Sequence, residues 1–200
     1  MKSRYLFFLF FVFYTKASFA QDTYFVQDSI IQVNRLNNKI SELKAFLNGH
    51  PNYNQTIAIL IDFKQFSGHN RLFVFDLNSN KIIKSALVAH GAGSETGNPD
   101  SLVFSNIPNS YKSSIGKYKI GVSYYGSFGK SYKLHGLDNT NSKAFERFIV
   151  LHKYDDVPDL EQDEPIVNSL GCPMVSPATF DYLDKIIQAA NNPVVMEIFY

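Results

Sequence analysis

The chain of 200 residues contains a single cysteine and no tryptophan. One cysteine cannot form an internal disulfide, so the chain is not a disulfide-stabilised scaffold. Charged residues make up only 18% of the sequence and the formal net charge is +1, which gives no sign of a nucleic-acid partner. The length and the apolar content suit one globular domain with a real core, so the lone thiol is the first feature to explain.

The first twenty residues have the features of a secretory signal peptide. Lys2 and Arg4 give a positive start, residues 6–12 are unbroken apolar, and small residues precede a cleavage site after Ala20. The apolar run is too short to span a bilayer comfortably. We therefore expect an exported protein of the periplasm or cell envelope, with no stable membrane span after removal of the signal.

Cys172 lies in a stretch whose sequence suits a nucleophile. Gly171 precedes it directly, Ser169 stands two residues before that glycine, and Ser176 and Pro177 can begin a helix just after it. Glycine lets the backbone bend sharply and leaves N–H groups free to face a developing oxyanion. Cysteine often fills a core as a small apolar residue, but a free thiol without a function is a disadvantage in the oxidising compartment that an exported protein enters. We predict a reactive thiol.

Hydrophobic periodicity predicts a mainly β, mixed α+β domain over residues 56–200, after an N-terminal helical segment at 21–55. Many short strands with few helices favour a β-sandwich or a partly closed barrel. Helices are expected at Asp28–Asn48, Asn141–Arg147 and Pro177–Ala190. Strands are expected at Ile57–Phe63, Leu72–Leu77, Ile82–Ala89, Val103–Ile107, Lys117–Val122, Tyr132–Leu137, Phe148–His152 and Val194–Phe199, with a loop at Tyr124–Gly129.

A thiol becomes a nucleophile near neutral pH when a base or a positive group lowers its pKa. His152 ends an apolar strand twenty residues before Cys172, and this spacing favours it as the base. His135 is the rival base, a group that orients His152, or a residue of the cleft wall. His90 lies in a glycine-rich corner, where it can line the cleft or be a plain turn residue.

The histidine and the cysteine together resemble the catalytic motif of the L,D-transpeptidase family: a strand-ending histidine, sixteen residues, then Ser-x-Gly-Cys. The resemblance implies that Cys172 attacks a carbonyl of a peptidoglycan stem peptide and that His152 carries the proton. It implies an oxyanion hole of backbone N–H groups at Gly171 and Cys172, with Ser169 bonded within the turn or to substrate. Stem peptides are the expected donor and acceptor, and no metal or organic cofactor is expected.

A second part of the sequence resembles the substrate-side strand and turn of the same family. It consists of His90-Gly91 followed by a serine-rich turn that contains Ser114 and Gly116. The implied substrate-binding residues are His90, His135, Ser114 and Gly116. Read without the resemblance, the serines and the glycine form a tight turn.

The motif departs from the better-known members in two places. Leu170 stands where they carry His or Arg, and Pro173-Met174 where they place Arg or Asn. Two alternatives therefore stay open: an L,D-carboxypeptidase or wall-peptide hydrolase that uses the same pair, and a non-catalytic cell-wall-binding module. A sortase-like enzyme would need a partner arginine. The arginines beyond the signal lie in no convincing site motif: Arg35, Arg71 and Arg147.

Overall fold

The structure is a computed structural model that describes residues 30–98 and 101–200. The expected signal peptide lies outside the described residues. The chain divides into two compact units, Met1–Glu42 and Leu43–Tyr200, and a helix over residues 30–48 crosses the boundary between them. Within the second unit, the last turns of this helix bury Leu43 and Leu47. Among the helices of the described ranges, none is long and apolar enough to cross a membrane.

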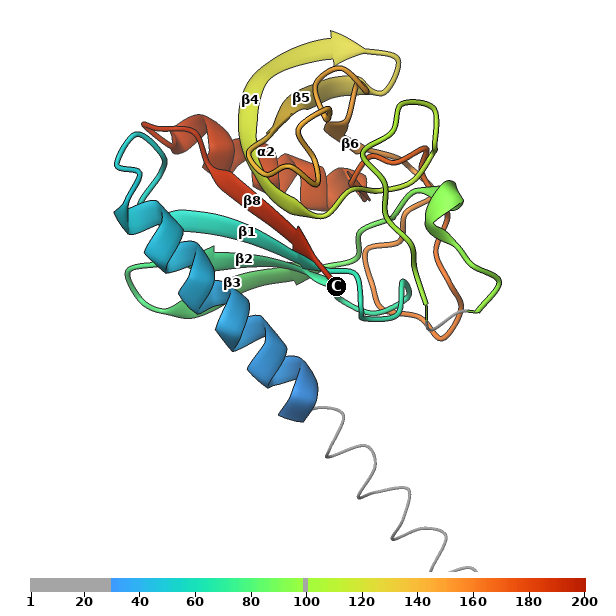
Figure 1. The fold of residues 1–200 in the computed structure, drawn as a ribbon, viewed down its shortest axis with the longest axis horizontal. Coiled ribbons are helices and arrows are strands. Elements are labelled where there is room, and N and C mark those ends of the chain that lie inside the picture. Colours follow the sequence, from blue (N-terminus) through green and yellow to red (C-terminus); the bar gives the residue numbers. More distant parts are fainter. Residues whose placement is uncertain (1–29, 99–100) are drawn as a thin grey trace, which may run out of the picture. The chain divides into compact units, whose positions relative to one another are not determined.

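The second unit is built on one mixed sheet of eight strands in the order β3-β2-β1-β8-β4-β5-β6-β7 (Figure 1). The sheet is open, with β3 and β7 at its edges. The expected mainly β, mixed α+β fold is therefore confirmed, with one open sheet in place of a closed barrel. The strands are β1 Ile57–Asp62, β2 Leu72–Asp76, β3 Lys81–Ala86, β4 Gly116–Gly126, β5 Gly129–Gly136, β6 Val150–Lys153, β7 Met174–Val175 and β8 Val195–Phe199.

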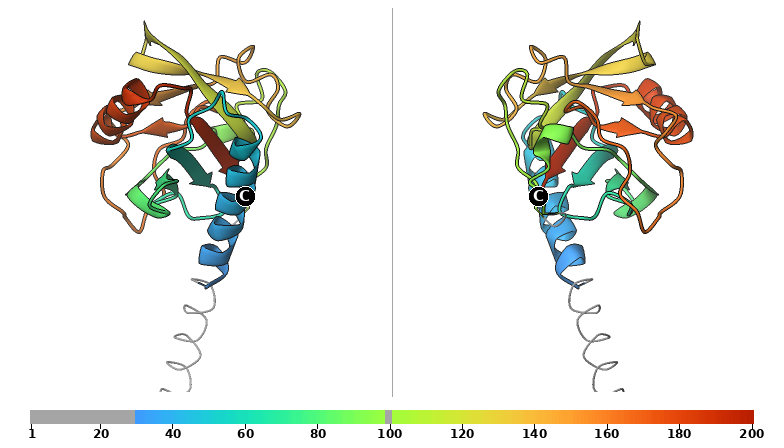
Figure 2. Two further views of the ribbon diagram at one scale, coloured as in Figure 1. Left: turned by 90° about the vertical axis from the view of Figure 1, so that its left-hand side faces the viewer. Right: turned by 90° about the vertical axis from the view of Figure 1, so that its right-hand side faces the viewer.

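Helix α2 (Pro177–Ala189) follows β7 and lies to one side of the strands (Figure 2). Its inner face buries Phe180 and Leu183 in the main core, together with residues of β6 and β7. The helix begins as expected, because the Ser176 hydroxyl accepts a hydrogen bond from Thr179 N–H at 3.1 Å and proline occupies the first turn. This cap fixes the chain four residues after Cys172.

Three expected segments differ in the structure. Val103–Ile107 forms no strand. Asn141–Arg147 forms consecutive turns rather than a helix. The Asn141 side chain accepts from Asp138 N–H and donates to Lys117 O, which offers the local backbone an alternative to helical hydrogen bonds. The expected loop Tyr124–Gly129 is instead a β-hairpin, because β4 extends to Gly126 and β5 begins at Gly129.

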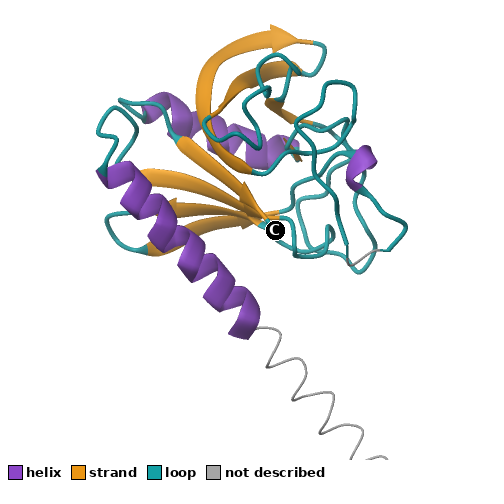
Figure 3. Ribbon diagram, viewed as in Figure 1, coloured by secondary structure: helices purple, strands orange, loops and turns teal. Residues whose placement is uncertain are grey.

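Two long irregular segments lie side by side at one end of the strands, residues 87–115 and 154–173 (Figure 3). An isolated bridge joins them at Gly91 with Ser169, and a second bridge joins Ala89 of the first segment to Met174 of β7. A short 3-10 helix, Ala92–Ser94, lies in the first segment. The turn that carries Cys172 is therefore held between β6, helix α2 and a distant part of the sequence.

Candidate active site

The turn that carries Cys172 is closed by its own serine. Ser169 Oγ donates to the carbonyl of Cys172 at 2.6 Å and accepts from Gly171 N–H at 3.1 Å. Gly171 has a φ of +116°, and a Cβ there would lie 2.9 Å from the Lys112 carbonyl oxygen, so glycine is required. The Gly171 N–H is thus engaged by Ser169. The Cys172 N–H has no hydrogen-bond acceptor among the described residues.

A second segment, residues 90–92, forms backbone hydrogen bonds with this turn. Ser169 N–H donates to the His90 carbonyl and Ala92 N–H donates to the Ser169 carbonyl, both at 2.8 Å. Gly91 lies directly against the turn, since a Cβ on it would come within 2.7 Å of Gly171 Cα. The two glycine-containing stretches that the sequence singles out therefore meet in space.

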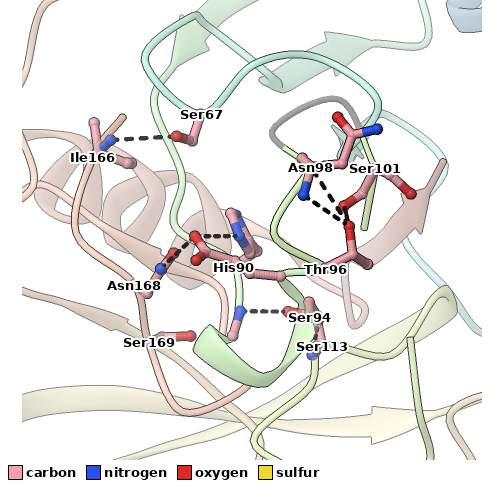
Figure 4. A network of polar contacts seen from close by, with 12 residues as sticks. Ser67, His90, Ser94, Thr96, Asn98, Ser101, Ser113, Ile166, Asn168 and Ser169 are labelled. Carbon is pink, nitrogen blue, oxygen red and sulfur yellow. Dashed lines mark hydrogen bonds and ion pairs between the residues drawn. The ribbon is translucent and has the colours of Figure 1, made fainter. Parts of the chain in front are cut away.

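The His90 side chain takes part in a polar network of its own (Figure 4). Its Nδ1 accepts from Arg71 Nη2 at 2.9 Å, so Nε2 carries the proton. Nε2 lies 3.6 Å from a Glu95 carboxylate oxygen that Asn168 also contacts, and it makes no hydrogen bond within the described ranges. Burial and the nearby Arg71 lower the pKa of His90 to about 3, so the ring is neutral.

The Cys172 thiol is half-buried against the start of β6. Val150 N–H donates to its sulfur at 3.4 Å, and the Phe148 carbonyl lies 3.8 Å from the same atom. Burial raises the pKa of the thiol above its ordinary value, while the Val150 hydrogen bond and the positive charge of Arg147 lower it. Burial is the largest of these effects, so the resting group is a thiol that needs help to ionise.

His152 is oriented by the backbone. Its Nδ1 lies 3.0 Å from the Lys153 carbonyl. A carbonyl can only accept, so Nδ1 carries the proton and Nε2 is the basic nitrogen. The Phe128 ring, at the tip of the β4–β5 hairpin, stacks on the imidazole with 4.2 Å between ring centres. Burial lowers the pKa of His152, while the Lys153 hydrogen bond raises it, so the ring is neutral at pH 7 and able to take a proton.

Strand register relates the histidine to the thiol. His152 pairs with Met174 in the parallel β6–β7 ladder. Two residues earlier on each side of this pair, the Val150 N–H contacts the Cys172 sulfur. The register thus places Cys172 two positions before Met174, the residue paired with His152.

Ser114 lies in the loop of residues 105–114, which approaches the turn of residues 169–172 that carries Cys172 (the nucleophile turn). Its Oγ lies 2.7 Å from the Tyr118 hydroxyl and accepts from Arg147 Nη1 at 3.2 Å. Ser114 therefore joins the site through Arg147. Sequence reasoning missed this arginine. The sequence offers one signal for Arg147: it directly precedes the predicted strand Phe148–His152. No motif marks it.

The other two predicted substrate residues have surroundings of their own. Gly116 begins β4 with a φ of +122°, and a Cβ there would lie 2.9 Å from the Asn141 side chain, so the backbone conformation and this close approach require glycine. His135 lies on β5 and stacks on Phe145 with 4.8 Å between ring centres. Within the described ranges, no group of three or more His, Cys, Asp or Glu residues is placed to hold a metal ion.

A thiol on a glycine turn, a histidine with a basic Nε2 and an unengaged backbone N–H are the parts of a cysteine-nucleophile site. A family model of the L,D-transpeptidase catalytic domain matches residues 27–196, and the chain belongs to this family. The family acts on peptidoglycan. No curated protein matches the chain.

Solved structures of low sequence identity resemble the chain. An L,D-transpeptidase from Xylanimonas cellulosilytica has 12% identity and a TM-score of 0.41, with 73% of this chain and 61% of that one covered. Bd1075 from Bdellovibrio bacteriovorus has 18% identity and a TM-score of 0.44, covering 73% and 48%. The helical cell shape determining protein Pgp2 from Campylobacter jejuni has 12% identity and a TM-score of 0.43, covering 72% and 47%. The chain thus spans about half to three fifths of these structures.

Proposed function

We propose that this chain is an exported L,D-transpeptidase that uses Cys172 to cleave and rejoin peptidoglycan stem peptides. The single observation that supports it best is the arrangement of the thiol: it lies on a glycine turn, two positions before Met174, whose strand partner His152 has its Nδ1 engaged by the backbone. That engagement leaves Nε2 as the only nitrogen of the ring that can take a proton.

The proposed reaction has two acyl transfers. The His152 Nε2 takes the thiol proton, and Cys172 sulfur attacks the carbonyl carbon of the third stem residue. The bond to the terminal D-amino acid breaks, and His152 protonates the leaving amine, which gives a thioester. The amine of a second stem then attacks this thioester and transfers its proton to His152. The C–S bond breaks with formation of the new cross-link, and the released thiolate takes the proton back from His152. Water in place of the amine gives hydrolysis instead.

The hydrogen bonds of the turn refine the expected oxyanion hole. Gly171 N–H is engaged by Ser169, which leaves Cys172 N–H as the donor for the tetrahedral intermediate. One donor of this kind is worth roughly 3–4 kcal/mol in other enzymes. We assign Ser169 and Gly171 to shaping the turn that aims this N–H.

Intact-mass measurement after incubation with muropeptide tetrapeptides tests the proposal. We expect the wild-type chain to gain a thioester-linked stem, with loss of the terminal D-amino acid, and Cys172→Ala to gain nothing. His152→Gln should also form no adduct, whereas His135→Gln, which replaces the rival base, should react like the wild type. A cross-linked product supports the transpeptidase and a trimmed monomer alone supports the carboxypeptidase. A folded, reduced chain without adduct or product contradicts both.

A further inference from the structure

Arg147 is held by one segment of the chain, the loop of residues 105–114. All its hydrogen bonds go to carbonyl and hydroxyl oxygens, and no carboxylate of the described residues pairs with it. Nη1 donates at 2.7 Å and 3.2 Å, and Nη2 at 2.6 Å and 3.4 Å. The acceptors are Ser105 O, Ser114 Oγ, Lys112 O and Ser110 Oγ, in that order. Both terminal nitrogens are therefore fully engaged, and the guanidinium plane is fixed in place.

This fixed cation lies against the nucleophile turn. Arg147 Nη2 is 3.6 Å from the position that a Cβ on Gly171 would take, and the Lys112 carbonyl is 2.9 Å from the same point. The Lys112 carbonyl thus touches both the guanidinium and the residue before the nucleophile. A larger residue at position 171 would push them apart.

The charges around the thiol leave Arg147 as the group that can stabilise a thiolate. Val150 N–H supplies one hydrogen bond to Cys172. Tyr118 also faces the thiol, but burial raises its pKa to about 12, so it is neutral. His152 is neutral because burial lowers its pKa. Among the described groups that face the thiol, only Arg147 carries a full charge.

We propose that Arg147 is a positioning residue that holds the 105–114 loop as a wall beside the nucleophile turn and directs a fixed positive charge at Cys172. The proposal deepens the proposed function, because it says how a buried thiol becomes a thiolate at that site. Arg147 acts through Cys172 and not as a clamp for substrate, since its terminal N–H groups are already engaged. When the thiol proton passes to His152, the sulfur anion that remains lies in the field of the guanidinium.

The pH dependence of Cys172 alkylation by iodoacetamide in the full chain tests this role. We compare the wild type with Arg147→Met, which removes the charge, and Arg147→Lys, which keeps the charge but cannot make the four hydrogen bonds. An opposite charge a few ångströms away shifts a pKa by about 1–3 units. The apparent thiol pKa should therefore rise by about one unit or more in Arg147→Met, and by less than half as much in Arg147→Lys.

Lys143→Gln is the matched control, because this exposed lysine lies on the same run of turns and its loss removes one charge away from the thiol. A folded Arg147→Met chain with the wild-type thiol pKa would overturn the proposal, as would an equal shift in Lys143→Gln. If Arg147→Met does not fold, Arg147→Lys decides: a shift of a full unit or more would show that charge is not what matters. Alkylation needs no peptidoglycan, so these outcomes are independent of the proposed substrate.

Discussion

Replacing Ser169 by alanine removes both hydrogen bonds that close the nucleophile turn. The hydroxyl donates to the Cys172 carbonyl at 2.6 Å and accepts from Gly171 N–H at 3.1 Å. Ser169 is only 5% exposed, so water replaces these bonds poorly. A typical intramolecular hydrogen bond contributes about 1 kcal/mol net. We therefore expect the free energy of unfolding to fall by about 2 kcal/mol.

The same change should slow the chemistry. Without the hydroxyl, the turn loses both hydrogen bonds that set the direction of the Cys172 N–H from within the turn, and small errors of position are costly in acyl transfer. We expect the rate of acyl-enzyme formation to fall at least about tenfold, which corresponds to about 1.4 kcal/mol of barrier. The freed Gly171 N–H does not compensate, because the turn that would aim it is loosened.

Urea unfolding followed by circular dichroism gives the stability, and intact mass with muropeptides gives the rate. Ser131→Ala is the control: this serine is 1% exposed, but its hydroxyl makes only a 3.4 Å contact with the Gly129 carbonyl. It should lose clearly less stability than Ser169→Ala and keep the wild-type rate. Equal stability of the two variants, with equal rates, would refute the account of the turn.

Two further predictions concern the histidines. Above pH 6.5 His90 is neutral both folded and unfolded, but its folded pKa of about 3 means that only the unfolded chain gains a proton as the pH falls from 6.5 toward 3. The free energy of unfolding of the wild type should therefore drop across that window, by up to about 1.4 kcal/mol per pH unit. Urea unfolding at pH 4.5 and pH 7 should show a smaller drop for His90→Gln. Identical drops would count against a neutral, buried His90 in the folded chain. Phe128→Ala uncovers the ring of His152, so the pKa of His152 should rise toward its ordinary value, as read by NMR titration; an unchanged titration would mean that Phe128 does not shield it.

The elements that follow from local pattern are those that sequence analysis placed well. Strands β1 and β2 and the start of α2 agree with their predicted positions, because short, nearly continuous apolar runs and a Ser-Pro cap act over a few neighbours. Strand β7 has only two residues, and no periodicity can reveal it. The segment Val103–Ile107 reads as a strand, yet its backbone bonds to the surrounding loops.

In the candidate site too, sequence analysis could predict the part that depends on neighbouring residues and not the part that depends on folding. Ser169, Gly171 and Cys172 are close in sequence, so their turn could be anticipated from residue types alone. The oxyanion assignment needed the structure, because the Ser169 hydroxyl engages one of the two N–H groups. The position of Arg147 beside the site could not be predicted from the sequence. Its hydrogen-bond acceptors lie 33 to 42 positions away in sequence, and only folding brings them to it.

The close approach of Gly91 to Gly171 couples two positions that are far apart in the sequence. A Cβ on Gly91 would lie 2.7 Å from Gly171 Cα, and Gly171 itself has no room for a side chain. A side chain at position 91 would therefore require a shift of the Gly171 backbone as well as of the Tyr111 carbonyl, which would lie 2.2 Å from the new Cβ. Descendants of this sequence that keep the nucleophile turn should therefore also retain Gly91, in the corner next to His90.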